Sequence, residues 1–184
     1  MANKLRRISV AVDDDTINML TNLASKENKT ISEIIRESIL MYSELERVDE
    51  KIDLNKIKTY ENLLGCRDHV ILDLEVWIAI LDELNEKASD DFWNTIANVG
   101  YTHGLHFKIG GTDSPQDILK SLELENLFEV KVEDGCFTLI LASRNEQKFA
   151  KIFLENLFRG IGLEVDILEG LRKLTIVQRK RTRD

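Results

Sequence analysis

The chain has 184 residues, of which 43% are hydrophobic and 32% charged, and a formal net charge of −8. This composition supports a folded core and excludes a low-complexity chain. The two cysteines, Cys66 and Cys136, show neither metal-ligand spacing nor a disulfide framework, and no apolar run approaches the roughly 18 residues of a membrane span. We therefore expect a cytoplasmic protein with no membrane partner.

Basic residues are concentrated at the two ends of the chain. Lys4, Arg6 and Arg7 precede the first acidic residue, Asp13, and residues 179–184 form a basic tail, RKRTRD. Local charge rather than net charge decides where a polyanion binds. The negative total therefore does not exclude nucleic acid as a partner.

The first predicted element is a strand over residues 5–12, in which apolar side chains alternate with Arg7, Ser9 and Ala11. A strand this short is not stable alone, and no second strand lies within hairpin reach. We therefore expect it to pair antiparallel with the same strand of a second chain, as a two-stranded ribbon across a two-fold axis.

Helical patterns follow this strand. The first helix is predicted from the aspartates at 13–15 to about Lys26, and the second begins with a capping box in which Thr30 is followed by Glu33. A third helix is predicted over 54–64, ending at Gly65. The residues expected to face inward on the second helix are Ile34, Ile35, Ile39, Tyr42 and Leu45.

Beyond Cys66 the pattern predicts an α+β domain with an antiparallel sheet. Its clearest signal is Asp134-Gly135 between two apolar runs, which is typical of a β-hairpin. Ser114-Pro115 and Gly160 are the predicted start and end of two of its helices. The predicted elements are strands over 69–75, 127–133, 136–142, 163–169 and 171–177, and helices over 76–87, 90–107, from 115, and 145–159.

The N-terminal sequences RRISVAVDDD and KTISEIIRES resemble the ribbon-helix-helix family of DNA-binding proteins, which includes CopG, NikR, MetJ and Arc. The resemblance implies that Arg7, Ser9 and Ala11 read bases in the major groove. It also implies that the start of the second helix, at residues 30–32, holds a DNA phosphate. With the basic residues that flank Arg7, the candidate phosphate contacts are Lys4, Arg6, Thr30, Ile31 and Ser32.

Residues 92–178 are similar in order and length to a vinyl-reductase-type small-molecule-binding domain, through YTHGLHF, FLENLFRGIG and EVDILEGLRKLTIV. Aromatic and histidine side chains in this part line a candidate pocket or, as the alternative, belong to the ordinary core. His103 and His106, at i and i+3, supply only two metal ligands, so we expect no metal site. The candidate pocket residues are Trp93, Tyr101, His103, His106 and Phe107.

These patterns predict four parts: a ribbon-helix-helix domain over 1–47, a helical connector over 48–65, a sensing or assembly domain over 66–178 and the basic tail. The expected function is a transcriptional regulator, not an enzyme, that binds operator DNA as a homodimer or tetramer. Its cofactor is unknown, a small-molecule effector being one candidate. The alternatives are the antitoxin of a toxin–antitoxin pair and a NikR-like metal-responsive regulator.

Overall fold

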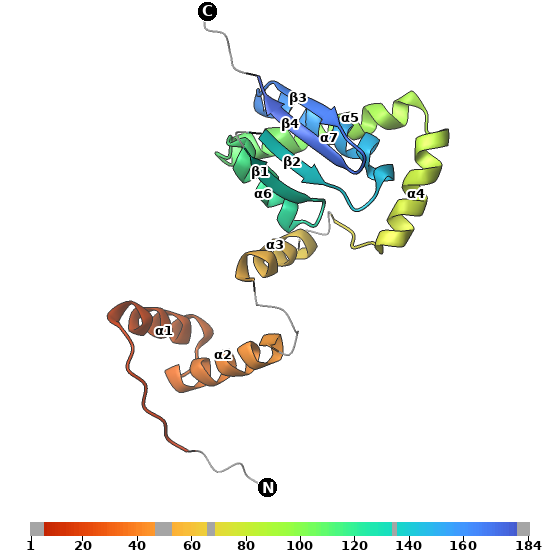
Figure 1. The fold of residues 1–184 in the computed structure, drawn as a ribbon. Helices are drawn as coiled ribbons and strands as arrows, with labels where there is room; N and C mark the ends of the chain where they lie inside the picture. The colour runs from red at the N-terminus through yellow and green to blue at the C-terminus, as the bar shows by residue number, and fades with distance from the viewer. Residues whose placement is uncertain (1–5, 47–52, 66–68, 134–135, 180–184) are drawn as a thin grey trace, which may run out of the picture. The chain divides into compact units, whose positions relative to one another are not determined.

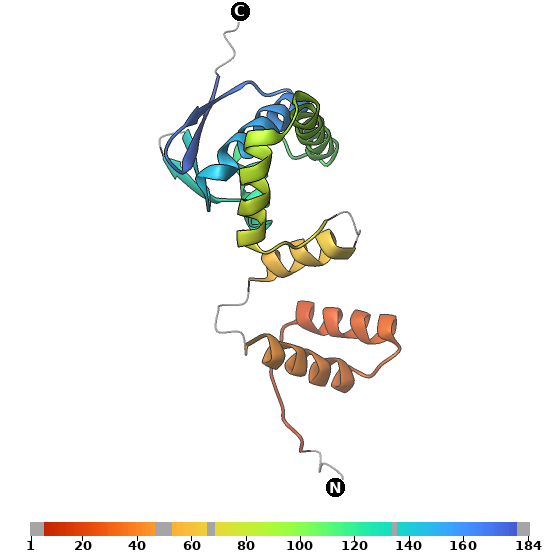
Figure 2. The same cartoon turned by 90° about the vertical axis from the view of Figure 1, so that its right-hand side faces the viewer.

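The computed structural model describes residues 6–46, 53–65, 69–133 and 136–179. The chain divides into two compact units, Met1–Asp53 and Leu54–Asp184, which Figures 1 and 2 show from two directions. Helix α3 (Leu54–Gly65) belongs to the second unit. None of the described helices combines the length and the hydropathy needed to cross a membrane.

The first unit contains two helices, α1 (Asp14–Glu27) and α2 (Ile31–Glu46), as the sequence predicts. Asp13 caps α1, its carboxylate accepting a hydrogen bond from the backbone N–H of Thr16 at 2.8 Å. The chain turns at Asn28, which adopts the left-handed conformation (φ 53°) that asparagine tolerates better than most residues. Before α1, residues 6–13 have no regular secondary structure in the single chain, so the predicted strand stays a prediction that needs a second chain.

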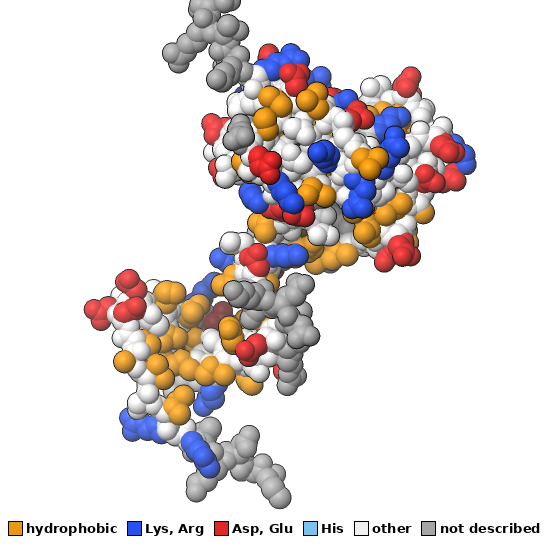
Figure 3. All heavy atoms as spheres, in the orientation of Figure 1, with side chains coloured by type: hydrophobic (Ala, Val, Ile, Leu, Met, Phe, Trp, Pro, Cys, Tyr) orange, Lys and Arg blue, Asp and Glu red, His pale blue; other side chains and the backbone are white. Residues whose placement is uncertain are grey.

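Only Ala24 and Ile34 are buried in the described part of the first unit. The prediction that Ile35, Ile39 and Tyr42 face inward is wrong for the single chain, because two short helices have too little surface to cover both apolar faces. Figure 3 shows hydrophobic side chains gathered over α1 and α2. The exposed ones are Ile8, Val10, Val12, Ile17, Met19, Leu23, Ile31, Ile35, Ile39, Leu40, Met41 and Tyr42.

The second unit is an α+β fold built on a four-stranded antiparallel sheet in the order β1-β2-β4-β3. The predicted hairpins are confirmed, since β1 pairs antiparallel with β2 and β3 pairs antiparallel with β4. The two hairpins join through β2 and β4, where Leu139 lies opposite Leu174. Its elements after α3 are α4 (Leu74–Lys87), α5 (Asp90–Ile109), α6 (Pro115–Leu124), β1 (Glu129–Glu133), β2 (Cys136–Ile140), the 3-10 turn η1 (Arg144–Glu146), α7 (Gln147–Ile161), β3 (Val165–Glu169) and β4 (Lys173–Gln178).

The core of this unit lies between one face of the sheet and the helices α6 and α7, which lie behind the sheet in Figure 1. Leu139 and Leu174 from the sheet are fully buried, as are Leu154, Leu157 and Phe158 of α7. An antiparallel sheet tolerates this one-sided covering because its strands alternate apolar and polar side chains.

Two predicted boundaries in the second unit are wrong. Residues 69–73 are not a strand, because the carboxylate of Asp73 accepts hydrogen bonds from the N–H groups of Glu75 and Val76 and thereby starts α4 at Leu74. Gly160 does not end the last helix, since α7 continues to Ile161 and Gly162 takes the left-handed position after it (φ 93°).

Gly160 instead lies where α7 crosses α5. A Cβ added at Gly104 would lie 2.1 Å from the carbonyl oxygen of Leu157, and one added at Gly160 would lie 2.4 Å from the carbonyl oxygen of Tyr101. Gly100 makes an equally close approach to Phe153. The two helices therefore pack backbone against backbone, which only glycine at these three positions allows.

Candidate nucleic-acid interface

The segment before α1 presents the residues that the sequence assigns to base reading. Arg7, Ser9 and Ala11 are all exposed, on a stretch that Figure 1 draws as an extended trace leading into α1. In the described part of the chain, neither Arg6 nor Arg7 forms an ion pair, so both guanidinium groups are available to an anion. Lys4 lies outside the described residues.

The apolar side chains of this segment are exposed, as its basic ones are. Ile8 and Val10 are each 72% exposed, and Val12 is also exposed. Leaving side chains of this size in water forfeits about 1.5–3 kcal/mol each relative to full burial. The described part of the first unit therefore exposes apolar side chains that nothing covers, and it carries two arginines, Arg6 and Arg7, that form no ion pair.

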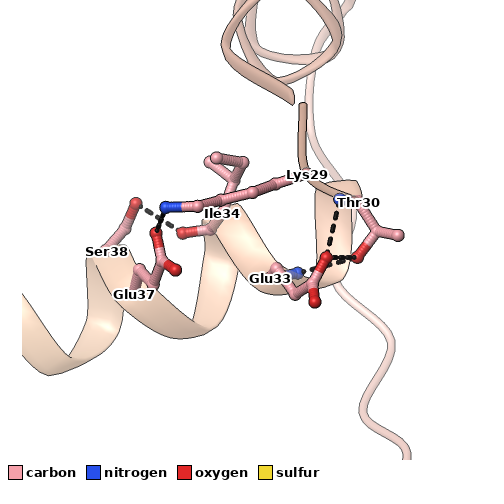
Figure 4. Close-up of polar contacts among 6 residues, drawn as sticks. All are labelled: Lys29, Thr30, Glu33, Ile34, Glu37 and Ser38. Carbon is pink, nitrogen blue, oxygen red and sulfur yellow. Dashed lines mark hydrogen bonds and ion pairs between the residues drawn. The ribbon is translucent and has the colours of Figure 1, made fainter. Parts of the chain in front are cut away.

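The start of α2 is held by the predicted capping box, drawn in Figure 4. The carboxylate of Glu33 accepts hydrogen bonds from the backbone N–H and the hydroxyl of Thr30, both at 2.8 Å, and the N–H of Glu33 donates to the hydroxyl oxygen of Thr30 at 3.2 Å. The hydrogen bonds from the backbone and hydroxyl of Thr30 lower the pKa of Glu33. The helix start thus already carries one anionic group.

Two backbone donors at the same helix end remain open. Within the described residues, the N–H groups of Ile31 and Ser32 donate no hydrogen bond, and both residues are exposed. Unsatisfied N–H groups at a helix N-terminus suit a phosphate oxygen. Of the three predicted helix contacts, Ile31 and Ser32 are therefore open to phosphate, whereas the N–H and hydroxyl of Thr30 are engaged with Glu33.

The turn between the two helices is tied down by Lys29. Its ammonium group donates to the carboxylate of Glu37 at 2.8 Å, and this hydrogen bond raises the pKa of Lys29. Figure 4 shows Lys29 reaching along α2 towards Glu37, away from the capping box. Lys29 therefore stabilises the α1–α2 turn, and its charge and that of Arg36 also act on Glu33 at the start of α2.

Two of the five candidate pocket residues of the second unit, His103 and His106, line the groove described below. Trp93 is buried with the ammonium of Lys148 4.0 Å from its ring centroid, and Phe107 packs against the sheet core. The Tyr101 ring lies 5.4 Å from the guanidinium of Arg159. These three aromatic side chains have separate neighbours and are absent from the groove described next.

His103 and His106 do share a surface groove of about 320 Å³ along α5. The ring of His103 lies edge-on to Phe153 at 5.5 Å, and burial, with smaller contributions from His106 and His69, lowers its pKa. Among the described residues, no three His, Cys, Asp or Glu side chains are grouped to hold a metal ion. The groove is lined by Thr95, Asn98, Val99, Thr102, His103 and His106.

Sequence reasoning missed one polar feature of the second unit. Arg179, assigned to the basic tail, donates from Nε to Asp166 at 2.9 Å and lines a second cavity of about 560 Å³ beside β3 and β4. The pairing lowers the pKa of Asp166. No local sequence signal could have found this pair, because its members lie 13 positions apart, across a hairpin.

Comparison with known proteins identifies the first unit alone. Residues 6–46 match the family described as "Ribbon-helix-helix protein, copG family", while no curated protein and no solved structure matches the chain. The expected vinyl-reductase-type domain has no support from these comparisons and stays a prediction. Ribbon-helix-helix proteins bind DNA as dimers. The match thus covers residues 6–46 alone, and the family that it names is one of DNA-binding regulators.

Proposed function

We propose that this protein is a sequence-specific transcriptional regulator whose two N-terminal segments pair as a β-ribbon in the major groove of operator DNA. The observation that carries the proposal is the exposed alternation over residues 6–12. Arg7 and Ser9 are exposed to solvent beside Ile8 and Val10, which are also exposed. Within a single chain, this arrangement leaves Ile8 and Val10 in contact with water.

A second copy accounts for both features. Pairing two such segments antiparallel turns Ile8, Val10 and Val12 to one face of the ribbon, where the exposed apolar faces of α1 and α2 from both chains can cover them. The other face then carries Arg7, Ser9 and Ala11, and a two-stranded ribbon fits the major groove. The proposed dimer thus buries the apolar side chains that the single chain exposes, and it leaves Arg7, Ser9 and Ala11 facing the DNA.

Each outward side chain has a distinct capacity for recognition. The Arg7 guanidinium can donate two hydrogen bonds to guanine, Ser9 can donate or accept one, and the Ala11 methyl can contact only an apolar group such as the thymine methyl. Arg6 and the open N–H groups of Ile31 and Ser32 suit phosphates, which position the ribbon without reading sequence.

The second unit is proposed to sense a ligand or to assemble the regulator. Its support is a complete α+β core, which DNA binding by the first unit does not require. An antitoxin of this family would use the same DNA module with a short toxin-binding tail, so a folded unit of this size favours the regulator. A metal-responsive regulator has no ligand group among the described residues to favour it.

Replacing Val10 tests the ribbon. Val10→Pro removes a backbone N–H from the predicted ladder, and Val10→Ile keeps the N–H and an apolar, β-branched side chain. We expect the proline variant to lose binding to a duplex that the unmodified protein selects, and the isoleucine variant to retain it. Unchanged binding by the proline variant, measured by fluorescence anisotropy, would refute the ribbon.

A further inference from the structure

The second unit exposes an apolar surface that its own core does not use. Val70 is 91% exposed and Ile71 is 67% exposed, on the segment that leads into α4. Figure 3 shows hydrophobic side chains gathered at this end of the second unit. We call this the α4 apolar surface; its members are Val70, Ile71, Leu72, Leu74, Val76 and Ile80.

Helix α4 is apolar on more than the side that packs inward. Leu81 is buried and the ring of Trp77 meets Phe149 edge-on at 5.2 Å, so these residues define the covered side. Val76 and Ile80 each precede one of them by a single position, which turns them about 100° away around the helix axis. Both remain exposed, so the apolar stripe of α4 is wider than the core that covers it.

Few charges interrupt this surface. Asp73 and Glu75 are the only ionisable residues between positions 70 and 80, and the Asp73 carboxylate is already hydrogen-bonded to the first N–H groups of α4. Burying the surface against another apolar surface would therefore desolvate little unpaired charge. Contiguous exposed apolar patches of this kind mark interaction sites on folded proteins.

We propose that the α4 apolar surface pairs with the same surface of the second copy within one regulator dimer, so that each dimer has a ribbon contact and an α4 contact. This inference rests on the proposed ribbon dimer, because the ribbon brings the second copy close. An isologous contact between identical surfaces closes the dimer without leaving a free apolar face.

The covalent link between the units makes the second copy the favoured occupant. From Glu46, the end of α2, to Leu54, the start of α3, there are eight residue steps, which span at most roughly 28 Å. Two second units tethered this closely to one ribbon meet at an effective concentration on the order of millimolar. To displace the second copy from the α4 apolar surface, another protein would have to be present above that concentration or bind the surface more tightly than the copy does.

The test isolates the α4 contact by disabling the ribbon dimer. Val10→Pro/Ile39→Asp breaks the ribbon ladder and places a charge on the exposed apolar face of α2, and we use this double variant as the background. Into it we introduce Val76→Asp, on the α4 apolar surface, or Ala79→Asp, on the exposed polar side of the same helix. Circular dichroism checks that each variant keeps its helices, and sedimentation velocity then measures the association constant of each variant.

We expect the background variant to form a weak dimer, Val76→Asp to weaken that dimer by roughly tenfold or more because it buries an unpaired charge, and Ala79→Asp to leave it unchanged. A background variant that stays monomeric up to about 1 mM protein, the effective concentration that the tether provides, or equal effects of the two aspartates, would overturn the proposal. So would an unmodified protein that is a tetramer and becomes a dimer with Val76→Asp, since the contact would then join separate dimers. DNA binding by the unmodified protein tests the regulator function separately, because none of these association constants depends on it.

Discussion

The carboxylate of Glu33 accepts two hydrogen bonds from Thr30, one from its backbone N–H and one from its hydroxyl, each 2.8 Å long. These bonds keep the pKa of Glu33 below its ordinary value, so the group is charged throughout the neutral range. The same helix end offers the N–H groups of Ile31 and Ser32 to a phosphate. The capping box that starts α2 therefore opposes the phosphate that this helix end is proposed to bind.

Glu33→Gln should strengthen DNA binding several-fold. Glutamine preserves a capping box, whereas the repulsion between carboxylate and phosphate disappears. The gain should be equal on selected and scrambled duplexes, because phosphates carry no sequence information, and it should shrink as salt is added. Glu27→Gln, which removes the same charge from the exposed end of α1, is the control and should change binding less. An equal gain for both variants would reduce the effect of Glu33 to net charge.

Arg7→Ala and Ser32→Ala should weaken DNA binding in different ways. Loss of a bidentate arginine–guanine contact costs about 1–3 kcal/mol of discrimination, which is roughly ten- to a hundredfold in affinity for the selected duplex. Ser32→Ala removes only a hydroxyl beside a phosphate, so selected and scrambled duplexes should lose affinity alike. Anisotropy titrations at several salt concentrations measure both. Equal losses on the two duplexes for Arg7→Ala would make Arg7 a phosphate contact.

Gly104→Ala should destabilise the second unit. The added Cβ would lie 2.1 Å from the carbonyl oxygen of Leu157, so α5 and α7 must separate. Overpacking of this kind costs about 1–3 kcal/mol or more, which lowers the unfolding midpoint by several degrees in a chain of this size. Gly65→Ala, whose Cβ would meet nothing within 4 Å, is the control and should leave the midpoint unchanged in thermal unfolding followed by circular dichroism.

Stability should fall as the pH drops through the range in which an unfolded histidine takes up a proton. Burial lowers the pKa of His103, so the unfolded chain binds more protons than the folded one once the pH falls below about 7. The free energy of unfolding should therefore be highest above this range and decline towards pH 5.5. His103→Gln should flatten that decline in urea unfolding. Identical slopes for the unmodified protein and His103→Gln would contradict this account.

Local signals predicted most elements of the fold. Asp13, Thr30 and Ser114 cap the helices that the sequence assigns to them, and Asp134-Gly135 separates the two strands of the predicted hairpin. The strand prediction over 69–75 is wrong because the apolar residues of this run fit a strand and the start of a helix equally well. The capping carboxylate of Asp73 decides in favour of the helix.

Tertiary relationships were beyond local signals. Gly160 follows an apolar helix and so predicts its end, but the close approach of α5 requires glycine inside the helix. The candidate site shows the same division. Its residue positions follow from alternation and the capping box, whereas the proposed opposition between Glu33 and a phosphate depends on distances that spacing alone does not give.

The central claim is that two copies of residues 6–12 form one ribbon that reads DNA. Its most direct test is selection of duplexes from a randomised pool by the full-length protein, followed by sequencing and by sedimentation of the complex. The account predicts an enriched motif with two inverted half-sites, bound by an even number of chains, and no enrichment by Val10→Pro. Recovery of no motif, or of one motif shared equally by the unmodified protein and Val10→Pro, would contradict it.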